Sequence, residues 1–151
     1  MPRLPRADSV LFVCSENAVR SPMAEAIAKK LCGTAVFVDS VGVRAGRIDP
    51  FVVETLAEIG IDSAGHVAKR LSDLMDTSFD LVVSLSPEAH HQALELTRTS
   101  AVEVEFWNLM DPTLIEGNRT TRLDAYRALR DALIERINAR LCGRRPPDPS
   151  R

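Results

Sequence analysis

The chain has 151 residues, 45% of them hydrophobic, and a formal net charge of −2. That length suits one domain with a full core, and the near-neutral charge favours neither nucleic-acid nor membrane binding. No apolar run approaches the length of a membrane span. Residues 1–8 lack the apolar segment of a signal peptide, so we expect a flexible tail before a single domain at residues 9–142.

The first predicted strand covers residues 10–13. It is wholly apolar and rich in β-branched side chains, which is typical of a buried parallel strand. A helix is then predicted to start here, with Ser21 as its N-cap and Pro22 at its first helical position. Apolar side chains recur every four residues after that point and extend the helix to about Cys32.

The loop between this strand and helix, Cys14 to Ser21, is predicted to bind an anion. Because it ends at the positive end of a helix, its backbone N–H groups can turn inward and form a cradle. We expect this cradle to be lined by Ser15, Glu16, Asn17, Ala18, Val19, Arg20 and Ser21. The alternative is a buried structural cysteine followed by a surface arginine.

The residue types in the loop suit attack on a phosphate-type oxyanion. The thiolate form of Cys14 is the nucleophile, and inward N–H groups with a nearby guanidinium stabilise its charge. Arg20 can bind two oxygens of a tetrahedral anion through its planar fork. Ser21 can donate a hydrogen bond to the sulfur. A C-x5-R-S pattern between an apolar strand and a helix therefore predicts an oxyanion site with its own nucleophile.

Strands and helices alternate through the rest of the chain, which predicts an α/β domain with a parallel sheet and the site at the carboxyl ends of its strands. Further strands are expected at residues 35–38, 81–83 and 102–106, the last a half-exposed edge. Further helices are expected to begin at Asp49-Pro50 and Ser86-Pro87, with a short turn at 71–75 and a closing helix over 123–141. Residues 143–151 are expected to be disordered.

The other cysteine and histidine residues show no metal pattern. The three cysteines are odd in number and widely spaced, which predicts reduced thiols in a cytoplasmic protein and no zinc site. Cys142 is expected on a frayed helix end. His90 and His91 stand together at the start of a helix and are expected to be solvated.

Residues 9–140 resemble the low-molecular-weight protein tyrosine phosphatases and the arsenate reductases that share their fold. The resemblance rests on the pattern VLFVCxxNxxRSPMAEA, on Asp39-Ser40-Val41-Gly42, on Gly60-Ile61-Asp62, on His66 and on Asp111-Pro112. It implies one three-layer domain with a parallel four-stranded sheet flanked by helices, of Rossmann-like type. We expect neither a metal nor a cofactor, because backbone amides and Arg20 can neutralise the developing charge.

The resemblance also implies roles for residues outside the loop. Asp111 corresponds to the acid that protonates the leaving group and then activates water, although Asp-Pro alone is also a common helix cap or turn. Asn17, whose residue type tolerates a left-handed conformation, corresponds to a residue held by a serine and a histidine. Those partners match Ser40 and His66 here, and the alternative is that both are ordinary surface residues.

Several positions depart from the phosphatase pattern and bear on the substrate. Glu16 replaces a glycine and adds negative charge at the mouth of the loop, and Val19 replaces a second cysteine. Thr113, Leu114 and Gly46 stand where phosphotyrosine enzymes carry aromatic walls. Phosphotyrosine is therefore the least supported part of the resemblance.

Three functions remain, and we rank a cysteine-dependent phosphate monoester hydrolase first. It would act on a phosphorylated protein or a small phosphomonoester through a cysteinyl-phosphate, with phosphate, arsenate and vanadate as ligands. The second is an arsenate reductase, a branch that Trp107-x-x-x-Asp111-Pro112 resembles. With no cysteine between Gly33 and Leu141, such a reductase would need an external thiol. The third is a weakly active oxyanion-binding or regulatory homologue.

Overall fold

The computed structural model describes residues 7–74, 78–98 and 100–142, so most of both expected tails lies outside the described residues. The strands are β1 (Ser9–Cys14), β2 (Phe37–Gly42), β3 (Leu81–Ser84) and β4 (Glu103–Phe106). The α-helices are α1 (Arg20–Cys32), α2 (Pro50–Ala57), α3 (Pro87–Thr97) and α4 (Arg119–Ile137). Shorter helical turns are η1 (Leu71–Asp73), η2 (Pro112–Leu114) and η3 (Asn138–Cys142).

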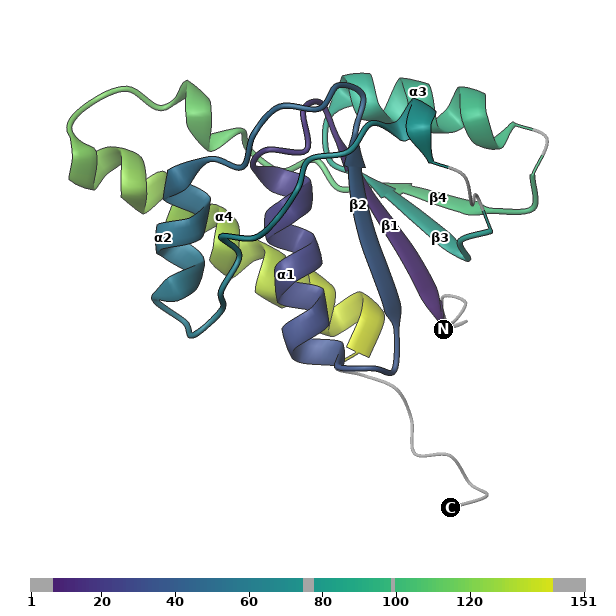
Figure 1. Ribbon diagram of the computed structural model, residues 1–151, viewed down its shortest axis with the longest axis horizontal. Coiled ribbons are helices and arrows are strands. Elements are labelled where there is room, and N and C mark those ends of the chain that lie inside the picture. Colours follow the sequence, from purple (N-terminus) through teal and green to yellow (C-terminus); the bar gives the residue numbers. More distant parts are fainter. Residues whose placement is uncertain (1–6, 75–77, 99, 143–151) are drawn as a thin grey trace, which may run out of the picture.

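All four strands are parallel and follow the order β2–β1–β3–β4 (Figure 1). Parallel neighbours need crossover connections, and helices supply them here, which confirms the predicted α/β fold. Parallel strands also end at one common edge of the sheet. At that edge Cys14 is paired with Gly42, so the end of β1 lies beside the end of β2.

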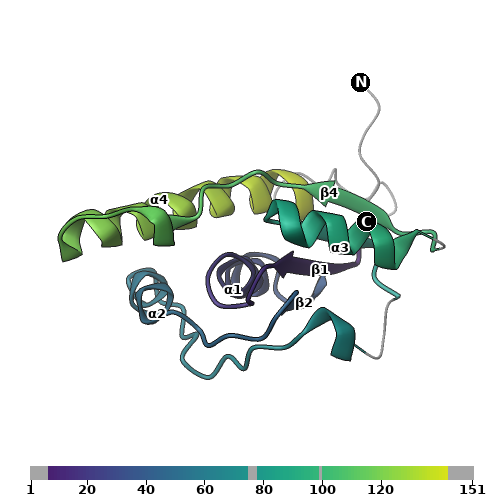
Figure 2. The same ribbon diagram turned by 90° about the horizontal axis from the view of Figure 1, so that it is seen from above.

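The sheet is covered on both faces. Val10, Phe12 and Cys14 belong to a core cluster shared with α1 and α4, whereas Leu11 and Val13 belong to a smaller cluster shared with α3. This split follows from the period of two in a strand. Figure 1 shows α1, α2 and α4 grouped away from α3, and Figure 2 shows α4 running past both α2 and α1.

Two strands test the predicted boundaries and exposure. Strand β2 begins two residues later than expected and extends to Gly42, next to the predicted anion loop. Strand β4 lies at the edge of the sheet with no buried residue, which confirms its predicted character. At the start of the chain, Ala7 is buried and the Asp8 carbonyl accepts a 2.9 Å bond from Phe37 N, so these two residues are not a loose tail.

Helix α1 begins two residues earlier than predicted, and the expected Ser21 cap is wrong. The N-cap residue is Val19, which makes no side-chain capping bond. The Ser21 hydroxyl instead lies within the loop, 2.8 Å from the Cys14 sulfur. Ser21 stands where a capping residue is expected in the sequence, but its hydroxyl contacts the sulfur of Cys14 instead.

The end of the chain corrects the prediction of three reduced thiols. After Ile137 the closing helix continues as a π-helical turn to Cys142, and Cys142 forms a disulfide with Cys32. The Cα atoms of the two cysteines lie 5.2 Å apart because η3 packs against the end of α1. Within the described chain, no helix combines the length and apolarity that a membrane crossing requires.

Candidate active site

The backbone of the anion loop, residues 14–21, is held by the segment that follows β2. Four amide groups of that segment donate to loop carbonyl oxygens at 2.8–3.0 Å. The pairs are Val43 to Cys14, Arg44 to Ser15, Gly46 to Glu16 and Asp49 to Ala18. These bonds fix four loop carbonyls on the outside of the loop.

Outward carbonyls determine where the amide groups point. In a planar trans peptide, the C=O of one residue and the N–H of the next point in opposite directions. The N–H groups of residues 15, 16, 17 and 19 therefore turn toward the interior of the loop. The carbonyl of Val19 accepts a hydrogen bond from Met23 N inside α1. The N–H of residue 20 therefore points away from the helix, toward the interior of the loop. This is the cradle of amide donors that an oxyanion requires.

Gly42 makes room for this loop, a role that the sequence did not indicate. Apart from the carbonyl oxygen of Arg44, at 2.3 Å, the atoms nearest to a Cβ at position 42 would be Asn17 N, at 2.5 Å, and the carbonyl carbon of Glu16, at 2.6 Å. Both atoms belong to the loop backbone, which cannot give way without moving the cradle. The last residue of β2 must therefore lack a side chain.

Cys14 lies at the base of the loop, with hydrogen-bonding groups arranged around its sulfur. The residue is only 3% exposed, and its sulfur lies 2.8 Å from Ser21 Oγ. Asn17 Nδ2 donates to Ser21 Oγ at 2.8 Å, so the serine oxygen is already an acceptor. Its own proton can then point to the sulfur, with the Val41 carbonyl oxygen, at 3.3 Å, as the other acceptor within reach.

Asn17 occupies the left-handed conformation, with φ of 53°, and is fully buried. Its Nδ2 donates to Ser40 Oγ at 2.9 Å, and its Oδ1 lies 3.0 Å from His66 Nε2. The backbone N–H of Lys69 donates to the same oxygen at 3.0 Å. Because an amide oxygen only accepts, His66 must present an Nε2–H here. Ser40 and His66 are thus in contact with the loop rather than dispersed on the surface.

Glu25, on α1, extends this polar network and was missed by sequence reasoning. Its Oε1 accepts from Ser40 Oγ and lies 3.8 Å from His66 Nδ1. Burial lowers the pKa of His66 below its ordinary value of 6.5, while the charge of Glu25 acts in the opposite direction. A glutamate in the MAEA stretch of a helix carries no local signal of such a contact, which depends on how β2 packs beside α1.

Arg20 and Asp111 meet at the rim of the loop. The guanidinium of Arg20 donates to the Leu109 carbonyl at 3.2 Å and lies 3.8 Å from Asp111 Oδ2. Asp111 also accepts from the backbone and hydroxyl of Thr113, at 3.0 and 2.7 Å, and caps η2. The Asp111 carboxylate therefore caps a helical turn, which was the alternative to a catalytic role, and it also lies beside the arginine of the loop.

A small cavity of about 80 Å³ lies at the centre of these groups. Its lining consists of Cys14, Ser15, Glu16, Ala18, Val19, Arg20, Asp111 and Thr113. Sites for drug-sized molecules measure roughly 300–1,000 Å³. A cavity this small suits a tetrahedral ion, and the rest of any substrate would lie outside it.

The mouth of the cavity carries charge of both signs. Glu16 is exposed there, as its sequence position suggested. Arg44 forms two hydrogen bonds with Glu88, at 2.8 and 3.0 Å. These bonds raise the pKa of Arg44, and the charge of Glu16 adds a smaller effect in the same direction. Because the charge of Arg44 is already matched by Glu88, the three groups together keep the one net negative charge that Glu16 brings.

The two histidines predicted to be solvated behave differently. His91 is exposed. His90 is not free in solvent, because its Nδ1 lies 2.8 Å from Ser84 Oγ and its ring stacks on Phe106 with centroids 5.0 Å apart. In the part of the chain that is described, no three His, Cys, Asp or Glu side chains gather in a way that could hold a metal ion.

Comparisons with known proteins agree with this geometry. The family model of the low molecular weight phosphotyrosine protein phosphatases matches residues 9–141. An arsenate reductase of Bacillus licheniformis is 32% identical over 133 residues, which cover 85% of this chain and 91% of that protein. A glutaredoxin arsenate reductase of Synechocystis is 30% identical over 128 residues, covering 85% and 92%.

Solved structures give the same picture. A mutant of YwlE from Bacillus subtilis is 29% identical with a TM-score of 0.72, covering 85% of this chain and 93% of that one. Another YwlE structure, described as an arginine phosphatase, carries a phosphorylated active-site serine (28% identical, TM-score 0.71, coverage 85% and 90%). An arsenate reductase in its phosphate-binding state is 29% identical with a TM-score of 0.69, covering 87% and 95%. The chain therefore belongs to the low molecular weight phosphotyrosine protein phosphatase family.

Proposed function

We propose that the protein is a cysteine-dependent phosphate monoester hydrolase. The observation that carries the proposal is the meeting of a nucleophile, an anion clamp and a carboxyl group around one small cavity. Cys14, Arg20 and Asp111 all line it. Hydrolysis needs these three groups and water, and no further thiol.

In the first step the thiolate of Cys14 attacks phosphorus in line with the ester oxygen. An S–P bond forms, the P–O bond to the leaving group breaks, and Asp111 gives its proton to the leaving oxygen. The inward amide groups and Arg20 hold the three equatorial oxygens, where the charge is spread. Ser21 donates its hydrogen bond to the sulfur.

In the second step water attacks the cysteinyl-phosphate. Asp111, now a carboxylate, accepts a proton from the water as the new O–P bond forms and the S–P bond breaks. Cys14 returns as a thiolate and inorganic phosphate leaves. A YwlE mutant of the same fold, in which a serine replaces a cysteine, carries phosphate on its active-site serine, and this supports an intermediate of this kind.

The second candidate is an arsenate reductase, which the names of the curated relatives favour. Reduction of arsenate needs thiols beyond the nucleophile to supply electrons. Apart from Cys14 the chain has two cysteines, and these are joined to each other at the far end of α1. A reductase built on this chain would therefore depend on an external thiol, which ranks it second.

The substrate we infer is a phosphorylated protein or a small phosphomonoester. Because the cavity holds little more than a tetrahedral ion, the remainder of the substrate would contact the mouth. The exposed side chains of Met110 and Leu114 flank the acid there and offer apolar contact without an aromatic slot. We place the protein in the cytoplasm, whose reducing environment keeps the thiol of Cys14 active and would open the Cys32–Cys142 bond wherever reductants reach it.

The test compares wild type with Cys14→Ala on para-nitrophenyl phosphate in EDTA. We expect wild type to release nitrophenol and to be inhibited competitively by vanadate and arsenate. The variant should release no nitrophenol. If wild type releases no nitrophenol, a second assay with arsenate and glutathione, mycothiol or thioredoxin distinguishes the reductase from the anion-binding protein. Arsenite production would establish the reductase, and its absence together with vanadate binding would establish an anion-binding protein.

A further inference from the structure

The segment between β4 and η2, residues 107–111, carries the proposed acid and is here called the acid loop. Its last residue, Asp111, lies 3.8 Å from the guanidinium of Arg20, and its Leu109 carbonyl accepts from the same guanidinium at 3.2 Å. A shift of the acid loop therefore changes the distance between Asp111 and a bound anion. A misplacement of about 1 Å can cost about 10²-fold in rate. The contacts that hold the acid loop in place thus bear directly on the proposed reaction.

The acid loop begins at Trp107, which is buried. The backbone N–H of Trp107 donates to the Ser84 carbonyl at the end of β3, and its own carbonyl accepts from Leu109 N, both at 2.9 Å. The ring packs edge-on against Phe12 of β1, with centroids 5.8 Å apart. Because the Leu109 carbonyl accepts from Arg20, two hydrogen bonds connect the backbone of Trp107 to the arginine of the anion loop.

Glu105, the third residue of β4, holds the indole group of Trp107. Its Oε1 accepts from Trp107 Nε1 at 3.0 Å, and its Oε2 accepts from Arg140 Nε at 2.6 Å. Side chains alternate along a strand, so Glu105 and Trp107 point to the same face of the sheet, the face that α4 covers. Figure 2 shows the C-terminal end of α4 next to β4. The side chain of Arg140 is only 10% exposed, so little water screens its pairing with Glu105.

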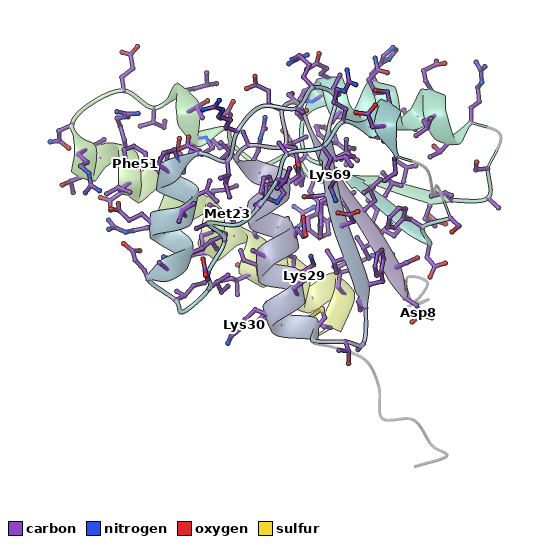
Figure 3. All side chains as sticks on the ribbon, in the orientation of Figure 1. Asp8, Met23, Lys29, Lys30, Phe51 and Lys69 are labelled. Atoms are coloured by element: carbon purple, nitrogen blue, oxygen red, sulfur yellow. A yellow bond between two sulfur atoms is a disulfide. The ribbon has the colours of Figure 1, made fainter. Side chains whose placement is uncertain are left out.

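The partner of Glu105 is itself fixed by the core of the domain. Arg140 belongs to η3, which packs against the C-terminal end of α1, the end that Lys29 and Lys30 mark in Figure 3. Ile137 and Leu141, on either side of Arg140, are buried in the core cluster. Packing therefore keeps the guanidinium in place in addition to the disulfide at the end of η3.

We propose that Glu105 is a positioning residue for Asp111. By holding the indole of Trp107, it fixes the first residue of the acid loop and keeps Asp111 beside the anion loop. Glu105 does not line the cavity, so it acts only through the acid loop. The inference rests on the proposed hydrolase, because only a reaction with a leaving oxygen uses Asp111 as an acid.

The test compares the turnover of two esters. Phenyl phosphate has a leaving group with a pKa of about 10, the value of tyrosine, whereas para-nitrophenyl phosphate has a better leaving group that depends less on the acid. Glu105→Leu removes both acceptor oxygens and should slow phenyl phosphate about tenfold more than nitrophenyl phosphate. In an Asp111→Asn background, Glu105→Leu should leave the ratio of the two rates unchanged, because the acid is already absent.

Three further variants make this result specific. Glu103→Leu is the matched control, because Glu103 is an exposed residue of the same strand, and it should keep the wild-type ratio. Glu105→Gln retains an oxygen acceptor for the indole N–H and should restore most of the ratio. Glu105→Leu leaves Arg140 without its partner, which can prevent folding. Trp107→Phe is therefore the second test, since it removes only the indole N–H from this network and should change the ratio in the same direction.

A second measurement does not depend on turnover. In the ¹⁵N-labelled full chain, the amide signals of Leu109, Asp111 and Thr113 report the acid loop, and Thr113 N–H donates to the Asp111 carboxylate itself. We expect these signals to shift in Glu105→Leu and to keep their wild-type positions in Glu103→Leu. Because no ester is used, this result separates failure of the inference from failure of the proposed function.

Three outcomes would overturn the proposal. Equal slowing of the two esters in Glu105→Leu and in Trp107→Phe would mean that the acid is unaffected. A further change of the ratio in the Asp111→Asn background would mean that Glu105 acts through another group. Acid-loop signals that stay unchanged in Glu105→Leu, or that shift equally in Glu103→Leu, would show that the Glu105 carboxylate does not hold the acid loop.

Discussion

The two ends of α1 place two cysteines in opposite chemical settings. Just before its N-terminus, Cys14 lies 2.8 Å from the Ser21 hydroxyl inside a loop whose amides turn inward. At its C-terminus, Cys32 is joined to Cys142. Both residues are buried, at 3% and 8% exposure, so burial does not distinguish them. What differs is the set of neighbours: hydrogen-bond donors at one end, and a second sulfur at the other.

This difference gives the two cysteines separate roles, one in the proposed reaction and the other in the stability of the fold. The hydrogen-bonding groups around Cys14 suit the nucleophilic role that we propose for its sulfur. The Cys32–Cys142 bond closes a segment of 110 residues and ties the end of the chain to α1, a constraint that acts on stability. The account therefore predicts that changes at one end alter turnover and changes at the other alter stability.

The largest effect is expected at the nucleophile. Cys14→Ala should lower turnover of para-nitrophenyl phosphate by about 10⁴-fold or more, because no S–P bond can form. Its unfolding midpoint in urea should stay close to that of wild type. Residual turnover within about tenfold of wild type would remove Cys14 from the mechanism.

Asp111→Asn is expected to have the next largest effect, and one that depends on the substrate. Phosphate esters with leaving groups of high pKa should react about 10²–10⁴-fold more slowly, since they need a proton, whereas nitrophenyl phosphate should be affected much less. The control is Asp131→Asn, an exposed carboxylate on α4. Equal slowing of both substrates by Asp111→Asn would contradict its role as the acid.

Gly42→Ala should impair both turnover and folding. The added methyl group would lie 2.5 Å from Asn17 N, so the loop must shift or the core must expand. We expect a loss of about 1–3 kcal/mol in unfolding free energy and of about 10²-fold in turnover. Gly65→Ala is the matched control, because a Cβ there meets nothing within 4 Å. Similar results for the two variants would mean that Gly42 does not shape the loop.

The opposite end of α1 should respond only in stability. Cys142→Ser should lower the unfolding free energy by about 2–4 kcal/mol in urea titration. Turnover of the folded enzyme should remain that of wild type. Added reductant should destabilise wild type and leave the variant unchanged. A parallel fall in turnover would show that the two ends of α1 are not independent.

The smallest expected effect is a pH dependence from His66. Burial lowers its pKa below 6.5, so between the two values the unfolded chain binds a proton that the folded chain does not. The contribution is complete above about pH 6.5 and is lost as the pH falls through the lowered folded pKa. His66→Gln keeps a donor for Asn17 and removes the titration. Its stability should vary less with pH across this window, and an unchanged slope would contradict the assignment.

The parts that could be predicted from sequence are those with local causes. An apolar β-branched run, a C-x5-R-S loop and an amphipathic helix all lie within residues 9–32, so their order places Cys14 at a strand end. The left-handed Asn17 also follows from its residue type and surroundings. The edge character of β4 is visible in its alternation of apolar and acidic residues.

The parts that could not be predicted depend on packing between distant segments. Nothing near Gly42 indicates that the loop backbone will lie against it. The contact of Glu25 with Ser40 needs β2 to lie beside α1. The disulfide needs η3 to return to the end of α1, whereas odd and widely spaced cysteines read alone indicate free thiols.

The most direct test of the central claim is to trap the phosphorylated enzyme. Wild type mixed with ³²P-labelled phosphomonoester and quenched in mid-turnover should carry label on the peptide that contains Cys14. Cys14→Ala should carry none, and Cys142→Ser should be labelled like wild type. Turnover by wild type with no protein-bound phosphate, or label that persists in Cys14→Ala, would contradict the account.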